Sequence, residues 1–392
     1  MASEQIKFVD LARQNKSIEQ ELTSEINRSL LSGIAIDGPY TDSLERSLVN
    51  MSGFGFAVTV NSGTQALELM AKYVRKKAEP ILSSNTAQQP GYRQAALVPA
   101  LTFRATANAL IRAGWDIEFG DVDYNGLLIQ PDGVEYTVGV PVGLYGQNFP
   151  DDERFMFDFM LLDGAQSWLG VNSDKVAWNT RLDDPSAYHS GLAAQAISFD
   201  PTKNLAANGN GGAVLTNNKT MAEWVRKMRC HGVGRSIASD VIGTNSRISE
   251  IDAATLTVKL RHICAWQKRR RAIAKYWNDR FQYYPIRSFV TKENIDAHGL
   301  QKYAICLQVP IPEVIAILSE NGIQTKRHYE LPLHELPVFS SYANPGCLST
   351  ASMLARSVVS LPFYPELSDA EVEYIADSTI SAVTTLSAQT FA

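Results

Sequence analysis

Short apolar runs alternate with amphipathic stretches between residues 54 and 217 of this 392-residue chain. Such an alternation of strands and helices is typical of an α/β layer fold. Most of the apolar runs lack a polar residue at every second position, which indicates strands that are covered on both faces. The runs predict seven strands, at residues 56–60, 95–100, 117–122, 137–142, 159–163, 196–200 and 212–216.

Two helices are predicted from apolar positions at helical spacing. In residues 64–77 these positions are Leu67, Met70, Ala71 and Val74. This helix begins just after a polar turn, so its N-terminus is free to meet a ligand. A second pattern, over residues 255–283, predicts one long helix that leaves the large domain and leads into a smaller one.

The long helix divides the predicted chain into two domains. We expect residues 1–260 to form an N-terminal segment and a large α/β domain. Residues 261–392 are then the connecting helix and a small α+β domain. Two stretches without periodicity, residues 80–94 and 171–193, are predicted to be surface excursions.

The charge balance argues against nucleic acid as a partner. The net charge is -5, with 36 Lys and Arg residues against 41 Asp and Glu residues, so no global basic field exists. The basic run at residues 268–271 has no interleaved aromatic residues, and we interpret it as a solvated helix face. Small molecules are therefore the expected ligands.

The cysteines predict neither a metal site nor a redox motif. The chain has four, widely separated and without a Cys-x-x-Cys pair, which favours reduced thiols in the core: Cys230, Cys264, Cys306 and Cys347. The N-terminus lacks a charged leader followed by an apolar stretch, and no apolar run is long enough to cross a membrane. We therefore expect a cytoplasmic protein without a membrane partner.

The main candidate for chemistry is Lys203. It lies in a polar turn between an apolar strand and a glycine-rich return, GNGGAVLT at residues 209–216. A lysine enclosed there by glycines and hydroxyl groups can lose its hydration, which lowers its pKa and frees the amine to attack an aldehyde. Ser198, five positions earlier, is placed to donate a hydrogen bond to a phosphate.

Three further positions add to this pattern. Asp163 ends a predicted strand, and a carboxylate there can keep a pyridine nitrogen protonated, although a helix cap is an equally good interpretation of that residue alone. Gly63 and Thr64 open a helix, where free backbone N–H groups and the helix dipole favour an anion. Phe103 follows another strand and offers an aromatic face for stacking, although alone it also fits a core position.

In this order the motifs resemble the DegT-type (DegT/DnrJ/StrS-like) sugar aminotransferases, which are fold-type I enzymes. The likeness spans nearly the whole chain. It rests on FVDL (8–11), IDGP (36–39), SGTQAL (62–67), DGAQ (163–166), SFDPTK (198–203), GTNSR (243–247) and LPFYP (361–365). The resemblance implies a large domain with a seven-stranded, mostly parallel sheet flanked by helices, and a smaller α+β C-terminal domain.

The resemblance also implies pyridoxal 5'-phosphate as the cofactor and assigns a role to each site residue. Lys203 and Asp163 are the catalytic pair, with Lys203 bonded to the cofactor and Asp163 at its pyridine nitrogen. Gln166 is placed near the ring hydroxyl, and Phe103 stacks on the ring. The implied phosphate cradle consists of Gly63, Thr64 and Ser198, with Asn245 from the partner subunit of a homodimer.

The implied reaction moves an amino group from L-glutamate to a keto-sugar linked to a nucleoside diphosphate, as in the biosynthesis of amino sugars and polysaccharides. One alternative is a cyclitol or another cyclic ketone as the acceptor. Another is a regulatory protein that keeps the cofactor pocket without turnover. The dehydratase branch of the family carries a histidine in place of the lysine, so Lys203 favours amino transfer.

The chain departs from the family at two positions near the expected site. Gly143 stands where relatives often have a histidine, and Asp200 stands where histidine or tyrosine is common. His328 and Tyr329 match a small-domain segment that reaches the mouth of the family's active site, and we leave both outside the catalytic set. In the same segment, residues 326–327 (Lys-Arg), together with His328, are candidates to meet a diphosphate or to be an ordinary solvated loop.

Overall fold

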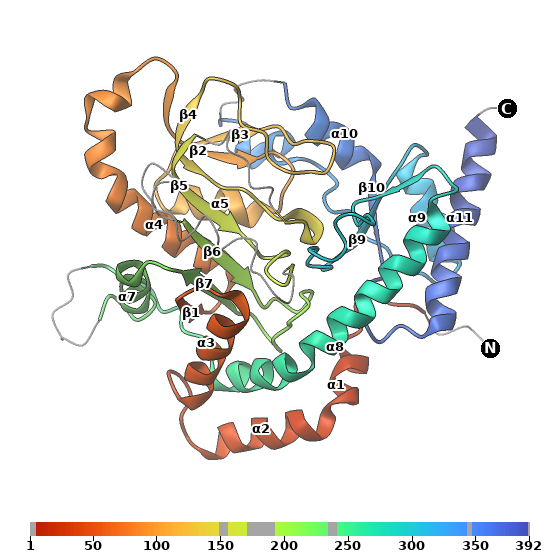
Figure 1. Cartoon of the computed structure of the whole chain (residues 1–392), viewed down its shortest axis with the longest axis horizontal. Helices are drawn as coiled ribbons and strands as arrows, with labels where there is room; N and C mark the ends of the chain where they lie inside the picture. Colours follow the sequence, from red (N-terminus) through yellow and green to blue (C-terminus); the bar gives the residue numbers. More distant parts are fainter. Residues whose placement is uncertain (1–4, 149–155, 171–192, 234–240, 343–346, 391–392) are drawn as a thin grey trace.

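The computed structural model describes residues 5–148, 156–170, 193–233, 241–342 and 347–390. Two sheets are joined by one long helix, α8, which crosses the molecule diagonally in Figure 1. The helices are α1 (Leu11–Ser17), α2 (Glu19–Leu31), α3 (Pro39–Ser52), α4 (Gly63–Leu82), α5 (Arg104–Arg112), α7 (Lys219–Met228), α8 (Glu250–Phe281), α9 (Ile311–Glu320), α10 (Ser349–Ser357) and α11 (Asp369–Thr390).

The larger sheet has seven strands in the order β1-β7-β6-β5-β4-β2-β3. All neighbouring pairs are parallel except those made by β7, which is antiparallel to β1 and to β6. The predicted mostly parallel, seven-stranded sheet is therefore confirmed. The strands are β1 (Phe56–Val60), β2 (Tyr92–Pro99), β3 (Ile117–Gly120), β4 (Glu135–Gly139), β5 (Phe157–Asp163), β6 (Ala193–Ser198) and β7 (Gly212–Thr216).

Helices cover both faces of this sheet, which explains why its strands are apolar throughout. Successive side chains of a strand point to opposite faces. Thus Val58 of β1 packs in one core cluster with residues of α4, α5 and α7, while its neighbour Ala57 packs in another with residues of α3 and α8. The buried strands bring the carboxyl ends of β2, β4, β5 and β6 to a common edge.

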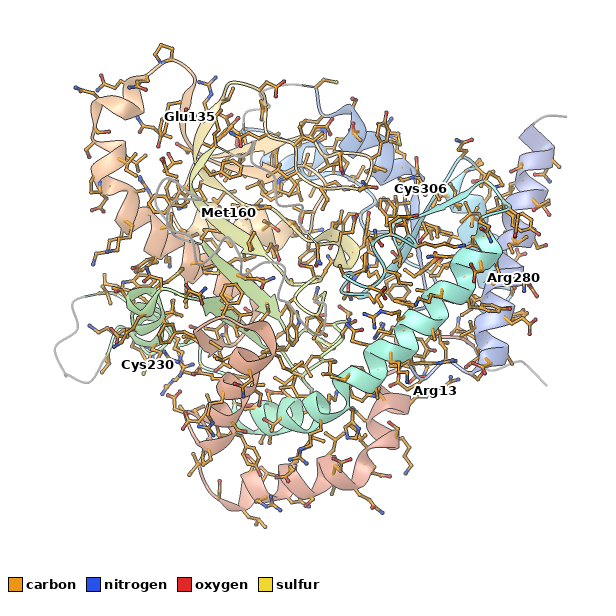
Figure 2. The ribbon with its side chains drawn as sticks, in the orientation of Figure 1. Arg13, Glu135, Met160, Cys230, Arg280 and Cys306 are labelled. Atoms are coloured by element: carbon orange, nitrogen blue, oxygen red, sulfur yellow. The ribbon has the colours of Figure 1, made fainter. Side chains whose placement is uncertain are left out.

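The smaller sheet is antiparallel, in the order β10-β9-β8, and is formed by β8 (Ile286–Ser288), β9 (Tyr303–Leu307) and β10 (Val358–Leu361). Its core surrounds Trp277 of α8, whose ring centroid lies 4.8 Å from that of Tyr303. Helices α9 and α11 lie side by side over this core (Figure 1). Arg13 holds α11 through two hydrogen bonds to Glu371, of 2.9 and 2.8 Å, and Figure 2 labels it beside that helix.

Between β9 and β10 of the smaller sheet, the chain returns to the larger sheet. Leu333, Phe339 and Leu354 belong to the core cluster of the larger sheet. Asp121, just after β3, accepts hydrogen bonds from the first N–H groups of α10, at 3.1 Å from the nitrogen of Thr350 and 2.8 Å from that of Ala351. The division into residues 1–260 and 261–392 stays a proposal, and this segment crosses it.

Three predictions from the sequence are corrected by the structure. Residues 80–94 are not one excursion, because α4 continues to Leu82 and β2 begins at Tyr92; residues 171–192 lie outside the described part. Arg270 of the basic run is buried, because α8 turns this side chain toward Phe363 of the small domain. None of the four free cysteines is a core residue: Cys264 and Cys347 are exposed, and Cys230 and Cys306 are partly buried.

Within the described ranges no helix is long and apolar enough to span a membrane.

Candidate active site

A cavity of about 310 Å³ opens at the carboxyl edge of the larger sheet. This volume is in the range of small-molecule sites in proteins. Seven of the eight predicted site residues line it: Gly63, Thr64, Phe103, Asp163, Gln166, Ser198 and Lys203. The eighth, Asn245, does not. The structure therefore brings together residues that span 140 positions, from 63 to 203.

Lys203 is held by a tight turn directly after β6. Its backbone N–H donates to the carbonyl of Asp200 at 2.8 Å, and the Asp200 carboxylate accepts from the N–H of Thr202 at 2.9 Å. Burial lowers the pKa of the Lys203 amine, and the negative charges of Asp163 and Asp200 act in the opposite direction. Lys203 thus has the lowered pKa that a lysine needs in order to act as a nucleophilic amine.

Asp163 ends β5 and is almost entirely buried, at 6% exposure. One carboxylate oxygen accepts from the hydroxyl of Thr106 at 2.8 Å, and the other accepts from the N–H of Ala165 at 3.1 Å. Burial raises the pKa of this carboxyl, while these two hydrogen bonds and the charge of Lys203 lower it. A cationic nitrogen in the cavity would favour the ionised form still further.

Gln166 has a fixed orientation because both ends of its amide are bonded. Its oxygen accepts from the backbone N–H of Tyr145 at 2.9 Å, and its nitrogen donates to the hydroxyl of Tyr329 at 3.1 Å. Tyr145 in turn donates its hydroxyl proton to the carbonyl of His328 at 2.6 Å. This chain of bonds ties the wall formed by Gln166 to the small-domain segment that carries Tyr329.

The N-terminus of α4 approaches the end of β6 closely. A Cβ atom at Gly63 would lie 2.7 Å from the Cβ of Ser198, and one at Gly212 would lie 2.5 Å from the nitrogen of Gly63, so only glycine fits at both positions. Ser62 caps the helix by accepting from the N–H of Gln65 at 3.1 Å. The first N–H groups of the helix, which have no intrahelical partner, therefore open toward Ser198 and the cavity.

Phe103 precedes α5 and is 50% exposed, which is unusual for an aromatic side chain that also lines a cavity. Its ring centroid lies 5.8 Å from that of Tyr329.

Asn245 is exposed and forms an isolated bridge with Cys230, at the end of α7. Its predicted role in a partner's cavity stays a prediction.

Four residues of the site were not selected from the sequence. Thr106 bonds Asp163, while His328, Tyr329 and Lys302 line the cavity from the small domain. The sequence places His328 and Tyr329 near the site only through the family resemblance. Nothing in the sequence indicates that Lys302 belongs to the site, because it stands directly before an apolar strand, where a lysine is ordinarily solvated.

The two departures from the family have different structural consequences. At Gly143 a Cβ atom would lie 2.1 Å from the hydroxyl oxygen of Ser167, so no histidine fits in this backbone. Asp200 lines the cavity and braces the Lys203 turn. Lys326 and Arg327 do not line the cavity: the Lys326 ammonium lies 5.4 Å from the ring centroid of Phe8, and Arg327 donates to the carbonyl of Ala355 at 2.7 Å.

A lysine with a lowered pKa, a strand-end acid and an open helix N-terminus around one cavity define an enzyme site of the α/β class. A family model for the DegT/DnrJ/EryC1/StrS aminotransferase family matches residues 16–150 and 186–379. The chain belongs to this family, and the resemblance found in the sequence is confirmed.

The chain is similar over nearly its full length to characterised proteins and solved structures. A pleiotropic regulatory protein of Geobacillus stearothermophilus is 30% identical, covering 95% of this chain and 97% of the relative. A UDP-N-acetyl-3-dehydro-alpha-D-glucosamine 3-aminotransferase of Acidithiobacillus ferrooxidans is 28% identical, covering 95% and 96%. A crystal structure of a DegT DnrJ EryC1 StrS aminotransferase from Brucella abortus superposes with a TM-score of 0.80 at 26% identity, covering 96% and 99%.

Proposed function

We propose that this chain is a pyridoxal-phosphate-dependent aminotransferase that moves an amino group from L-glutamate to a keto-sugar linked to a nucleoside diphosphate. The observation that carries the proposal is the joint position of Lys203 and Asp163 in one cavity, close enough for the charge of each to affect the pKa of the other. Membership of an aminotransferase family supports the reaction type.

Pyridoxal phosphate fits the donors and acceptors of the cavity. The open N–H groups at Gly63 and Thr64, with the Ser198 hydroxyl, suit a phosphate. The Asp163 carboxylate, already held by two hydrogen-bond donors, suits a protonated ring nitrogen, and the exposed face of Phe103 suits ring stacking. When bound, the cofactor supplies an electron sink for the carbanion of the amino-acid substrate.

In this proposal the chain's own residues hold and move protons. Lys203 would hold the cofactor between turnovers, and its amine, once free, would take the proton from the substrate carbon as a base and deliver it as an acid to the aldehyde carbon of the cofactor. The Asp163 carboxylate would keep a proton on the ring nitrogen. Gln166, fixed by Tyr145 and Tyr329, would help to orient the ring.

The acceptor class rests mainly on relatives. The Acidithiobacillus relative is named for a UDP-linked 3-dehydro sugar, which supports a nucleotide-linked ketone for this chain too. Because Lys326 and Arg327 are engaged outside the cavity lining, they add no support for a diphosphate site. The Geobacillus relative is named as a regulatory protein, so a regulatory role without turnover is kept as the alternative. The presence of Lys203 and Asp163 in the cavity favours turnover.

We further propose a cytoplasmic homodimer that shares its active sites. Asn245 is exposed and outside the cavity of its own chain, so it is available to a partner. Four exposed apolar side chains follow one another at the end of α2 and in the segment before α3: Leu30, Leu31, Ile34 and Ile36. Exposed apolar side chains grouped in this way are typical of a contact surface.

The test is an assay of the purified protein with glutamate and a panel of acceptors, read out by mass. The panel contains nucleotide-linked 3-keto and 4-keto sugars, the matching free keto-sugars and a cyclitol ketone. We expect the mass change that accompanies replacement of a ketone oxygen by an amino group only with a nucleotide-linked sugar. The reason is that the nucleotide contributes binding far from the reacting carbon. Equal specificity constants for free and linked sugars would favour a free-sugar or cyclitol acceptor. No turnover with any acceptor, with cofactor bound, would favour the regulatory alternative.

A further inference from the structure

Lys302 is a second lysine of the active-site cavity. Apart from Lys203, it is the only lysine or arginine among the described residues that line this cavity. It stands just before β9 and is buried, at 5% exposure. Its backbone N–H donates to the carbonyl of Tyr145 at 3.1 Å, which fixes the small-domain strand against the wall of the larger domain.

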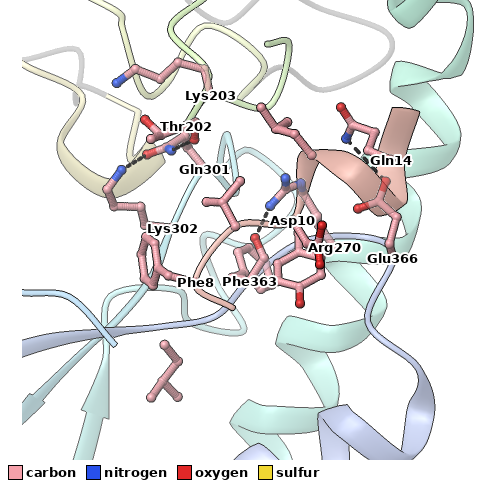
Figure 3. A pocket seen from close by; sticks show the side chains of 14 residues that line it. Phe8, Asp10, Gln14, Thr202, Lys203, Arg270, Gln301, Lys302, Phe363 and Glu366 are labelled. Atoms are coloured by element: carbon pink, nitrogen blue, oxygen red, sulfur yellow. Dashed lines mark hydrogen bonds between the residues drawn. The ribbon is translucent and has the colours of Figure 1, made fainter. Parts of the chain in front are cut away.

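The side chain of Lys302 reaches toward the turn that carries Lys203. Its ammonium donates to the side-chain oxygen of Gln301 at 2.6 Å, and the Gln301 nitrogen donates to the carbonyl of Thr202 at 2.8 Å (Figure 3). Lys302 also lines a small neighbouring cavity of about 20 Å³, which has room for a water molecule. An ammonium group has three donors, and the neutral Gln301 amide uses one of them.

Lys302 forms no ion pair within the described part of the chain. The charged groups that act on it are Lys203, Lys326 and Arg270, which repel a charged ammonium, and Asp200, which attracts one. Asp200 is already engaged by the backbone and hydroxyl groups of Thr202. Burial and the three cations therefore hold the pKa of Lys302 well below its ordinary value.

A buried cation is stable only when it is paired, so the surroundings of Lys302 favour an anionic ligand. The phosphate of the cofactor has its own cradle at Gly63, Thr64 and Ser198 on the larger domain. What remains is an anion on the substrate. Every amino-acid donor carries a carboxylate beside its reacting carbon, whereas a keto-sugar such as that named for the Acidithiobacillus relative has an uncharged ring and carries its negative charge on the nucleotide, away from the reacting carbon.

We propose that Lys302 is the residue that binds the α-carboxylate of the amino donor, and this proposal rests on the proposed aminotransferase function. The carboxylate accepts hydrogen bonds from the two N–H groups of the ammonium that Gln301 does not use. Because Lys302 and the Lys203 turn are linked through Gln301, the bound carboxylate fixes the donor's reacting carbon relative to Lys203. Lys302 thereby selects amino acids over simple amines as donors.

Binding of a carboxylate should take up a proton. The amine of Lys302 is neutral in the empty cavity at a pH above its lowered pKa, and only the ammonium form pairs with a carboxylate. Above that pKa, the affinity for a carboxylate falls about tenfold for each pH unit. A side chain with a merely structural role would not produce this proton uptake.

The test is calorimetric titration of the full-length protein, loaded with pyridoxal phosphate, with glutarate. Glutarate has the carboxylates of glutamate but no amino group, so it binds without reacting. Titrations at pH 8 in two buffers with different ionisation enthalpies give the protons taken up, and the cofactor's absorbance separates protonation of the cofactor from that of the protein. We expect proton uptake in the wild type, and in Lys302→Met no uptake and an affinity lower by about tenfold to a hundredfold.

Two further variants guard against a loss of folding. Lys302→Arg keeps a permanent charge, so it should bind glutarate without taking up a proton. Lys259→Met is the matched control, because Lys259 is another buried lysine, bonded to the carbonyl of Ala206 at 2.9 Å and outside the cavity lining. It should match the wild type in both affinity and proton uptake. Wild-type glutarate binding in both Lys302 variants, with uptake unchanged, overturns the proposal.

A second experiment tests whether the carboxylate that Lys302 binds belongs to the amino donor or to the sugar acceptor. Enzyme loaded with pyridoxamine phosphate is mixed in a single turnover with a nucleotide-linked keto-sugar whose ring is uncharged, or with its uronate counterpart. Lys302→Met should change the amination rates of the two acceptors by the same factor; a loss confined to the uronate would place the carboxylate on the acceptor and overturn the donor assignment. Failure of the proposed function is seen separately, as intact glutarate binding without turnover of any acceptor.

Discussion

Thr106 donates its hydroxyl proton to the carboxylate of Asp163 across 2.8 Å, from the helix after β2 to the end of β5. Both residues are buried. This bond supports the ionised form of a carboxylate whose pKa burial raises. Thr106 is therefore a positioning residue for Asp163, although it does not line the cavity.

Replacement of Thr106 by valine should move the acid limb of the pH profile. Without the hydroxyl donor the pKa of Asp163 rises further, so the carboxylate is lost at a higher pH as the solution is acidified. We expect the acid limb of kcat/KM to shift upward by about one pH unit. Thr106→Ser, which keeps the donor, should behave as the wild type. An unchanged profile in Thr106→Val would show that this bond does not tune Asp163.

Replacement of Lys203 by alanine should abolish both turnover and covalent attachment of the cofactor. The wild type, loaded with pyridoxal phosphate, should have a visible absorbance band; borohydride should remove this band and fix the cofactor onto the peptide that contains Lys203. Peptide mass mapping after reduction checks the attachment. Wild-type turnover of glutamate by Lys203→Ala would show that the assignment is wrong.

Mixed dimers test whether Asn245 acts on the partner's cavity. Subunits with Lys203→Ala and subunits with Asn245→Asp should each be inactive alone, the latter because a carboxylate repels the phosphate. In a heterodimer, one of the two sites then contains neither change, so activity should return to about half of the wild-type value. Heterodimers proven by mass but without activity would count against sharing of the site.

His298 should make the folded state less stable in acid. It is 1% exposed, and burial, together with the charge of Arg271, lowers its pKa to about 3. The unfolded chain binds a proton at this residue below about pH 6.5, and the folded chain does not, so stability falls as the pH drops from 6.5 toward 3. The contribution is about 1.4 kcal/mol per pH unit.

The variant His298→Asn isolates this contribution. The asparagine oxygen can accept the hydrogen bond that the histidine nitrogen accepts from the N–H of Leu300, at 2.9 Å in the wild type. Urea unfolding at pH 7.5 and 5.5, at a single protein concentration, gives the pH dependence of the free energy of unfolding. The variant should lose less stability on acidification; an equal loss in both proteins would mean that His298 is protonated in the folded state.

The sequence predicted the strands well where the sheet alone determines them. Residues 56–60 and 212–216 match β1 and β7 to the residue. The strand predicted at 196–200 ends instead at Ser198, because the Asp200 carboxylate bonds the N–H of Thr202 and turns the chain. The N-terminal end of β2 was missed, because pairing of Tyr92 with Glu135 of β4 extends it into a polar stretch.

The candidate site was predictable only where its residues belong to contiguous motifs. Lys203, Asp163 and Gly63 each stand at the junction of a strand or helix with a polar turn, and such junctions are visible in a single sequence. Lys302 joins the site only through the packing of β9 against the Lys203 turn, 99 positions away. Arg270 shows the converse error, since only the path of α8 past Phe363 reveals that this one side chain of the basic run is buried.

The return of the C-terminal chain to the larger sheet limits how this protein can fold during synthesis. Leu333, Phe339 and Leu354 complete the core that β1 begins almost 300 positions earlier. We therefore expect the larger domain to complete its core only after nearly the whole chain has emerged from the ribosome, rather than before the other domain is made. A nascent chain halted near residue 260 should expose part of its apolar core and need a chaperone to remain unaggregated.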